Sequence, residues 1–398
     1  RMLSFLGRGK AGGSGDPAGV EAMETETSGS SNLAGAQSVA IKLAANLQGH
    51  TDRAWCVAWE PHGRFLATCS SDKTARLWAP SAAAGGAWVT VAELEGVHTR
   101  TVRHVSWSPC GRMLATCSFD ASCAVWRERG GDWECAAVVE GHENEIKACA
   151  WSPSGTLLAT CGRDKTVWIW EVQPGFDFEC VAVLNGHTQD VKCVRWHPTE
   201  DVLVSTSYDD TIKVWEEDVN GDDWSCTLTL SEKENGHAST VWSAVFEPHG
   251  ARKMATCSDD GKIVVWSATA GAPGLALHAE CSFLSGHDRP VLSLSWGNRS
   301  GLIAAGGGDN SLRVFGSSTP DDDTDDEKKK PGGFREVGAV AKAHKDDVNC
   351  VAWHPTTPGV LASCADDGSV KIWNVVSEAS TQRKRTEIPF GPGFEGVR

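Results

Sequence analysis

Residues 141–171, GHENEIKACAWSPSGTLLATCGRDKTVWIWE, decide the fold of this chain. A Gly-His pair opens the stretch, an apolar run ends at Trp151, and a Pro-x-Gly turn follows. A second apolar run leads to Asp164, and Trp170 stands six residues after that aspartate. Variants of this pattern occur seven times along the chain, each opened by a histidine. They recur at a period of roughly 50 residues, which is typical of propellers and solenoids.

Each unit pairs its starting histidine with an aspartate 22 or 23 residues later. The pairs are His50 and Asp72, His98 and Asp120, His142 and Asp164, His187 and Asp209, His237 and Asp260, His287 and Asp309, and His344 and Asp367. A neutral imidazole can bond to a carboxylate and to a neighbouring hydroxyl at once. Seven equivalent pairs indicate a network that stabilises each unit, rather than one catalytic pair.

The repeat unit also contains four apolar runs of strand length. In the third unit they are Ile146–Trp151, Leu157–Cys161, Val167–Glu171 and Glu179–Leu184. Seven such units predict an all-β fold, a seven-bladed WD-repeat propeller. The seventh unit ends after its third strand, and the lone apolar segment 38–44 precedes the first unit. This N-terminal strand is therefore expected to complete the last blade and close the ring.

The repeats predict one domain, residues 38–376, flanked by segments without strand periodicity. Residues 1–37 are predicted to be a disordered leader and 377–398 a disordered tail. An insertion in unit six, residues 317–333, carries six acidic residues within 321–327 and is also predicted to be disordered. In the other units a tryptophan, which we call the closing tryptophan, stands six residues after the aspartate. Unit six departs furthest from the pattern, because it has Phe315 at this position and three consecutive glycines.

Composition excludes several classes of protein. The chain has 37 Lys and Arg against 52 Asp and Glu, a net charge of −15, which argues against direct nucleic-acid binding. No stretch approaches 18 consecutive apolar residues, so no membrane helix is expected. The 15 cysteines contain no C-x-x-C motif, and nine recur at equivalent repeat positions as small core residues. We therefore predict no metal site and no cofactor.

Two positions of each repeat are expected to face the same end of the ring: the residue before each aspartate and the fifth residue after each histidine. In units two to five these positions hold four cations and three aromatic residues: Arg103, Phe119, Lys147, Arg163, Lys192, Tyr208 and Trp242. Arginine and aromatic side chains are common interface anchors, so we predict a partner-binding surface here. Glu145 and Asp190 dilute the positive charge and can pair with Lys147 and Lys192. The alternative is that these side chains form only a solvated charged rim that binds no partner.

Several sequence motifs are more specific than the generic blade pattern: EGHENEIK at 140–147, CGRDKTVWIWE at 161–171, HTQDVK at 187–192, SYDD at 207–210 and DDW at 222–224. They resemble the cytosolic iron–sulfur protein assembly WD-repeat family, also called the Ciao1/Cia1 family. The resemblance covers about residues 39–376 and is strongest in units two to five.

This resemblance implies a non-enzymatic adaptor of the cytosolic iron–sulfur targeting complex. Its implied partners are a MIP18-like protein, a HEAT-repeat protein and client apoproteins, whose C-terminal peptides end in an aromatic residue. The family's top-face arginine matches Arg163. The implied location is the cytoplasm, with the nucleus as a second location. Two alternatives stay open: a generic scaffold in a chromatin or ubiquitin-ligase complex, and an enzyme at the propeller channel.

Overall fold

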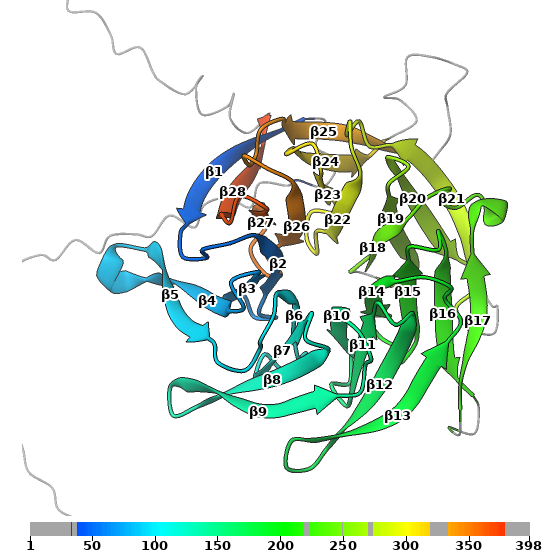
Figure 1. Cartoon of the computed structure of the whole chain (residues 1–398). Helices are drawn as coiled ribbons and strands as arrows, with labels where there is room; N and C mark the ends of the chain where they lie inside the picture. Colours follow the sequence, from blue (N-terminus) through cyan, green and yellow to red (C-terminus); the bar gives the residue numbers. More distant parts are fainter. Residues whose placement is uncertain are drawn as a thin grey trace, which may run out of the picture. The chain divides into compact units, whose positions relative to one another are not determined.

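The computed structural model describes residue 33 and residues 38–218, 221, 223–248, 250–269, 274–318 and 333–378. Their twenty-eight strands form seven antiparallel sheets of four strands each. The sheets are arranged as the blades of a ring, with one strand of each blade lining the centre (Figure 1). This confirms the predicted seven-bladed all-β propeller.

The blades follow the chain, each beginning with its innermost strand. Blade 1 contains β2 (Ala54–Trp59), β3 (Leu66–Ser70), β4 (Ala75–Ser81) and β5 (Ala87–Leu94). Blade 2 contains β6 (Val102–Trp107), β7 (Met113–Ser118), β8 (Ser122–Arg129) and β9 (Asp132–Glu140). Blade 3 contains β10 (Ile146–Trp151), β11 (Leu157–Gly162), β12 (Thr166–Gln173) and β13 (Asp177–Asn185). Blade 4 contains β14 (Val191–Trp196), β15 (Leu203–Ser207), β16 (Ile212–Glu217) and β17 (Trp224–Leu230).

The remaining blades continue the same order. Blade 5 contains β18 (Val241–Phe246), β19 (Lys253–Ser258), β20 (Lys262–Ala268) and β21 (Leu277–Leu284). Blade 6 contains β22 (Val291–Trp296), β23 (Ile303–Gly307), β24 (Leu312–Ser317) and β25 (Phe334–Val340). Blade 7 contains β26 (Val348–Trp353), β27 (Val360–Ala365), β28 (Val370–Ser377) and β1 (Val39–Leu47). Two short 3-10 helices, Ala82–Ala84 and Glu232–Glu234, lie in connections.

The ring is closed by the strand that comes first in the chain. β1 pairs antiparallel with β28, from Val39 opposite Ser377 to Leu47 opposite Val370. β1 thereby becomes the outer strand of blade 7, as the lone apolar segment predicted. The innermost strands β2 and β26 contact each other across this junction.

The hydrophobic core lies between neighbouring blades. One cluster joins Ile169 of blade 3 to Val194, Leu203 and Trp215 of blade 4. Of the nine cysteines expected in the core, eight are buried and Cys350 is partly buried. Closing aromatic residues and small thiols therefore pack together between neighbouring sheets, where removing apolar area from water stabilises the ring.

Most of the predicted flanking segments and the insertion lie outside the described residues. Leu33, the described residue of the predicted leader, is 2% exposed and packs into the core cluster of blades 6 and 7. The described residues on either side of the acidic segment are Ser318 and Gly333. The backbone N–H of Ser318 donates to the carbonyl oxygen of Gly333 at 2.8 Å. No helix in the described part of the chain has the length and apolar character needed to cross a membrane.

Candidate functional site

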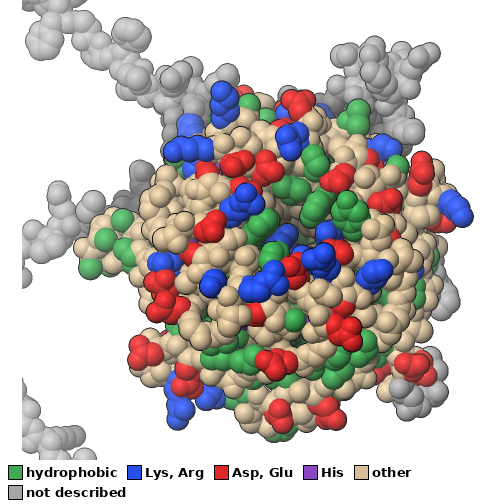
Figure 2. All heavy atoms as spheres, in the orientation of Figure 1, with side chains coloured by type: hydrophobic (Ala, Val, Ile, Leu, Met, Phe, Trp, Pro, Cys, Tyr) green, Lys and Arg blue, Asp and Glu red, His purple; other side chains and the backbone are tan. Residues whose placement is uncertain are grey.

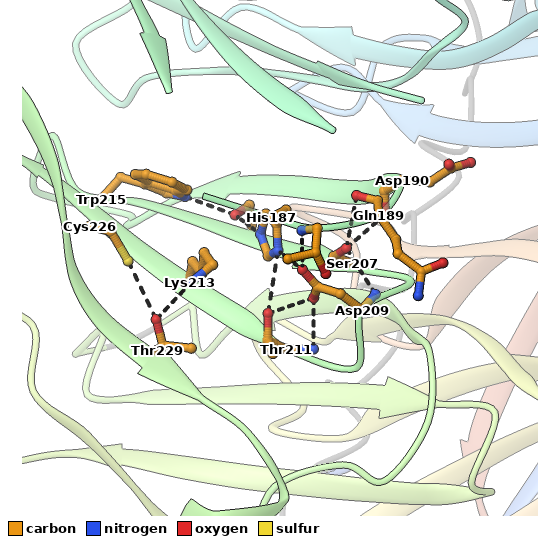
Figure 3. A network of polar contacts seen from close by, with 12 residues as sticks. His187, Gln189, Asp190, Ser207, Asp209, Thr211, Lys213, Trp215, Cys226 and Thr229 are labelled. Carbon is orange, nitrogen blue, oxygen red and sulfur yellow. Dashed lines mark hydrogen bonds and ion pairs between the residues drawn. The ribbon is translucent and has the colours of Figure 1, made fainter. Parts of the chain in front are cut away.

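Blade 4 shows what the repeated His and Asp do (Figure 3). His187 contacts Asp209 Oδ2 through Nδ1 at 2.9 Å and the Ser205 hydroxyl through Nε2 at 2.7 Å. The indole N–H of Trp215 donates to the same hydroxyl at 2.8 Å. Asp209 also accepts from the Thr211 hydroxyl at 2.6 Å. The network runs from the turn to the closing tryptophan, and the contacts of His187 and Asp209 lie within the blade.

In each of the seven predicted pairs, the His Nδ1 atom lies within 3.4 Å of the nearest carboxylate oxygen of its aspartate. In blade 2 the Nε2 atom of His98 bonds to the Thr116 hydroxyl at 2.8 Å. Its Nδ1 atom is closer to the Ser122 hydroxyl, at 3.1 Å, than to Asp120, at 3.4 Å. Blade 6 lacks the second half of the network, because Ala305 and Phe315 stand where blade 4 has Ser205 and Trp215. Each of the repeated histidines thus bonds within its own blade.

A β-bulge sets the side chains at the mouth of the central channel. In each of the seven inner strands the register shifts between the first and third residues. The skipped second residues are Trp55, Arg103, Lys147, Lys192, Trp242, Leu292 and Asn349. A bulge re-aims the extra residue out of the ladder. These are the residues that the repeat pattern predicted to share one end of the ring.

Two neighbouring pockets contain most of the predicted partner-binding residues. The first, which we call the Arg163 pocket, lies between blades 3 and 4 and has a volume of about 330 Å³. Its lining residues are Glu145, Lys147, Arg163, Gln189, Asp190, Lys192 and Tyr208. One face of the ring shows basic side chains around a central hollow (Figure 2). The volume of the Arg163 pocket is at the lower end for ligand pockets and suits one or two side chains.

Glu145 is the electrostatic centre of the Arg163 pocket. Its carboxylate accepts from Lys147 Nζ at 2.6 Å and from Arg100 Nη2 at 2.9 Å, whereas Arg163 Nη1 is 3.8 Å away. Partial burial alone would raise the pKa of Glu145, but the bonds from Lys147 and Arg100 outweigh burial and lower it. Glu145 therefore stays charged and satisfied, while the 57% exposed Arg163 side chain makes no hydrogen bond to a described residue.

The three predicted aromatic residues are not equally accessible. Lys147 Nζ lies 4.1 Å from the centre of the Phe119 ring, and the Arg100 guanidinium lies 5.8 Å from it. Trp242 is covered by Lys192 at 5.1 Å and donates its indole N–H to Asp259. Lys192 Nζ also lies 4.9 Å from the centre of the Tyr208 ring, but Tyr208 is 47% exposed and lies in the pocket with Arg163. It is therefore the ring best placed to stack on an incoming group.

The second pocket, which we call the channel pocket, lies at the centre of the ring. Arg103 lines it together with Lys192 and Trp242, and its guanidinium stacks 4.8 Å from the Trp55 ring. Burial lowers the pKa of Lys192, although the nearby Asp190 opposes that change. Lys192 belongs to both pockets, so the predicted residues form one continuous surface with two hollows.

Sequence reasoning missed two arginines in this region. Arg100 holds Glu145 and donates to the Phe119 carbonyl oxygen, yet it lies in the turn just after His98, outside the two repeat positions considered. Arg195 lines the channel pocket from the fifth position of β14. In the described part of the chain no group of three or more His, Cys, Asp or Glu side chains is arranged to hold a metal ion.

Comparison with protein-family models identifies the repeats. The model described as "WD domain, G-beta repeat" (WD40) matches seven segments of this chain: residues 41–79, 89–127, 133–171, 178–216, 224–267, 279–316 and 336–374. Each segment extends from the outer strand of one blade to the third strand of the next. The repeat boundaries seen in the sequence and the blades seen in the structure therefore agree with this model.

Comparison with curated proteins gives relatives that match this chain over almost their whole length. A probable cytosolic iron-sulfur protein assembly protein CIAO1 homolog of Chlamydomonas reinhardtii is 53% identical over 351 residues, 82% of this chain and 96% of the relative. The probable cytosolic iron-sulfur protein assembly protein Ciao1 of Aedes aegypti is 50% identical, covering 85% and 99%. Protein CIA1 of Arabidopsis thaliana is 45% identical, covering 83% and 96%.

Proposed function

The chain belongs to the WD-repeat family of cytosolic iron–sulfur protein assembly proteins, and from this membership we propose that it acts in cytosolic iron–sulfur protein assembly as a non-catalytic adaptor. The names of its relatives support the pathway and a cytoplasmic location. The adaptor role is supported by the binding surface at the channel mouth and by His–Asp pairs whose bonds are used within the blades. The implied partners are a MIP18-like protein, a HEAT-repeat protein and client apoproteins.

We place client recognition in the Arg163 pocket. A client peptide that ends in an aromatic residue offers a carboxylate beside an apolar ring. The Arg163 guanidinium can meet such a carboxylate with two parallel hydrogen bonds, because Glu145 is already held by Lys147 and Arg100. The exposed ring of Tyr208 lies in the same pocket and can stack on the peptide's aromatic side chain. The availability of the Arg163 guanidinium is the observation that carries this proposal.

A peptide titration tests it. A short client peptide loses conformational freedom on binding, so we expect micromolar affinity, about −8 kcal/mol. C-terminal amidation of the peptide, or Arg163→Glu in the protein, should weaken binding at least about tenfold. Arg129→Glu is the matched control, because Arg129 is also exposed (73%) and has a similar loose ion pair, 3.6 Å from Glu134. Equal affinity for acid and amide peptides would exclude carboxylate capture at this pocket.

A second experiment addresses the class of partner. Affinity purification of the full chain should recover iron–sulfur apoproteins and assembly factors, and Arg163→Glu should lose the apoproteins while retaining the assembly factors. Recovery of histones or ubiquitin-ligase subunits in their place would instead support a generic WD-repeat scaffold.

A further inference from the structure

The inner strands that form the wall of the central channel carry basic residues and no acidic ones. The seven inner strands, β2, β6, β10, β14, β18, β22 and β26, contain no Asp and no Glu. They contain four cations: Arg103, Lys147, Lys192 and Arg195. In a chain with a net charge of −15, this distribution sets the channel apart from the rest of the molecule.

Arg195 is the most unusual of these cations. It is the fifth residue of β14, where the other inner strands carry small or apolar residues: Ala58, Ser106, Ala150, Val245, Ser295 and Ala352. Arg195 is partly buried and lines the channel pocket beside Arg103, His104 and Lys192. No hydrogen bond or ion pair joins its guanidinium to any residue that the structure describes.

Arg103 is in a similar position. Its guanidinium stacks on the Trp55 ring at 4.8 Å but makes no hydrogen bond or ion pair with the described residues. Lys192 reaches Asp190 only at 3.5 Å. Two guanidinium groups thus line one small pocket with their hydrogen-bond donors unused. Taking unpaired charges out of water is costly unless an opposite charge compensates them.

The neutral groups of the pocket do not supply that opposite charge. A hydrogen bond with Cys56 and burial both raise the pKa of the Cys350 thiol well above its usual value. Burial, followed by the charges of Arg195 and Arg103, lowers the pKa of His104 well below its usual value. At neutral pH the Cys350 thiol and the His104 imidazole are therefore uncharged, and they leave the charges of Arg103 and Arg195 uncompensated.

We propose that the channel pocket binds a small inorganic oxyanion of the size of phosphate or sulfate, held chiefly by Arg195 and Arg103. A planar guanidinium matches two oxygens of an oxyanion at once. The pocket volume of about 40 Å³ has room for about three water molecules, which a small oxyanion would displace. The bound anion neutralises the channel wall and ties together blades 2 and 4. This site lies beyond the peptide pocket proposed above and does not depend on it.

Thermal unfolding and calorimetry of the full chain test the proposal, with sodium phosphate and sodium sulfate as probes and sodium chloride as the matched salt at constant ionic strength. A ligand that binds only the folded state stabilises it in a saturable manner. We expect phosphate to raise the Tm of the wild type by several degrees with saturation, and to give one-site binding heat. Arg195→Met keeps the apolar stem and removes the charge, so it should lose both effects.

A folding check on Arg195→Met and two further variants, Arg103→Met and Arg163→Met, keep the outcome interpretable. Arg195→Met should be at least as stable as the wild type in anion-free buffer, because it removes an uncompensated charge, and this checks its folding. Arg103→Met should weaken the phosphate response several-fold. Arg163→Met, in the neighbouring pocket, should leave the response unchanged. An equal, saturable phosphate response in the wild type and in Arg195→Met, or no saturable response in the wild type, would overturn the proposal.

The same variants separate this site from client binding. If the proposal holds, Arg195→Met loses phosphate binding but still binds the client peptide, whereas Arg163→Glu does the reverse. If phosphate competes with the peptide and Arg195→Met loses both ligands, the channel arginine belongs to the peptide's carboxylate site. That result would overturn an independent oxyanion site while leaving carboxylate capture by this face intact.

Discussion

Blades 4 and 6 share the same order of four antiparallel strands but differ in the polar chain, the chain of hydrogen-bonded side chains that starts at the repeated histidine. In blade 4 the His187 imidazole is bonded at both nitrogens, to Asp209 and Ser205, and Trp215 completes the chain. In blade 6 the Nδ1 atom of His287 contacts Asp309 and the Ser311 hydroxyl, both at 2.9 Å. Its buried Nε2 atom has no hydrogen-bond partner among the described residues.

The difference shows which forces are sufficient to form a blade. Blade 6 replaces the hydroxyl and the indole with Ala305 and Phe315, both fully buried, and Phe315 packs 5.3 Å from the Phe283 ring. Packing between sheets therefore forms the blade even where the polar chain is incomplete. The cost is an unsatisfied nitrogen, and burial lowers the pKa of His287, which keeps it neutral.

The largest expected contrast comes from deleting the two histidines. His187→Ala leaves the nearly buried Asp209 carboxylate (6% exposed) without its imidazole and should lower the free energy of unfolding by about 3–5 kcal/mol. His287→Ala breaks fewer bonds and should cost about 1–3 kcal/mol less. Urea unfolding of both variants measures the difference. Equal losses would mean that the polar chain contributes nothing beyond the volume of the ring.

A second contrast appears on acidification. Burial alone would raise the pKa of both aspartates, but bonds from their neighbours outweigh it: His187 and Thr211 hold the pKa of Asp209 far below normal, and Ser311 and His287 lower that of Asp309 to about 2. A lowered carboxylate pKa contributes stability that is present above about pH 4 and is lost as pH falls through the folded-state pKa.

Stability should therefore fall between about pH 5 and pH 2. Asp309→Asn should remove about 2 kcal/mol of that pH dependence, and Asp209→Asn should remove more. Unfolding curves of the two variants and the wild type across this range are the measurement. A steeper pH dependence in either variant than in the wild type would contradict the assignment.

The smallest expected effect is a repair of blade 6. Ala305→Ser places a hydroxyl where Ser205 stands in blade 4 and gives His287 Nε2 a partner, so it should raise the free energy of unfolding by about 0.5–1.5 kcal/mol. Ala304→Ser is the matched control: Ala304 is equally buried, but it packs in the apolar cluster of blades 6 and 7, whereas Ala305 packs in that of blades 5 and 6. The control should lose about 1–3 kcal/mol, and a gain from both substitutions would rule out a specific bond to His287.

The repeat made much of this architecture predictable. Counting from each histidine located the aspartates, the closing aromatic residues and the ring of second-position residues, because every blade reuses one local geometry. The same count, taken from His187 and from His287, arrives at Ser205 in blade 4 and at Ala305 in blade 6, and it could have revealed the incomplete blade. The closing strand was predictable because seven units of four strands needed one more.

The contents of the two pockets were less predictable, since they depend on contacts between blades. Nothing in the sequence around Arg100 shows that it reaches Glu145 of the next blade. A strict alternation along β14 would place Lys192 and Arg195 on opposite faces of the sheet. The register shift between Val191 and Cys193 removes that alternation, so both line the channel pocket. Bulges of this kind are set by the pairing partner as much as by the local sequence.

The pairing of β1 with β28 has a consequence for how the molecule is made. Synthesis runs from β1 toward β28, and Leu47, the last residue of β1, pairs with Val370 at the far end of the propeller sequence. At about 5–20 residues per second, β1 waits roughly 15–65 s on the ribosome with no partner strand. Bringing Leu47 and Val370 together closes the whole intervening polypeptide into a loop, which costs about 5 kcal/mol of chain entropy. The nascent chain can build six blades in order of synthesis, but the ring exists only once translation has passed Ser377.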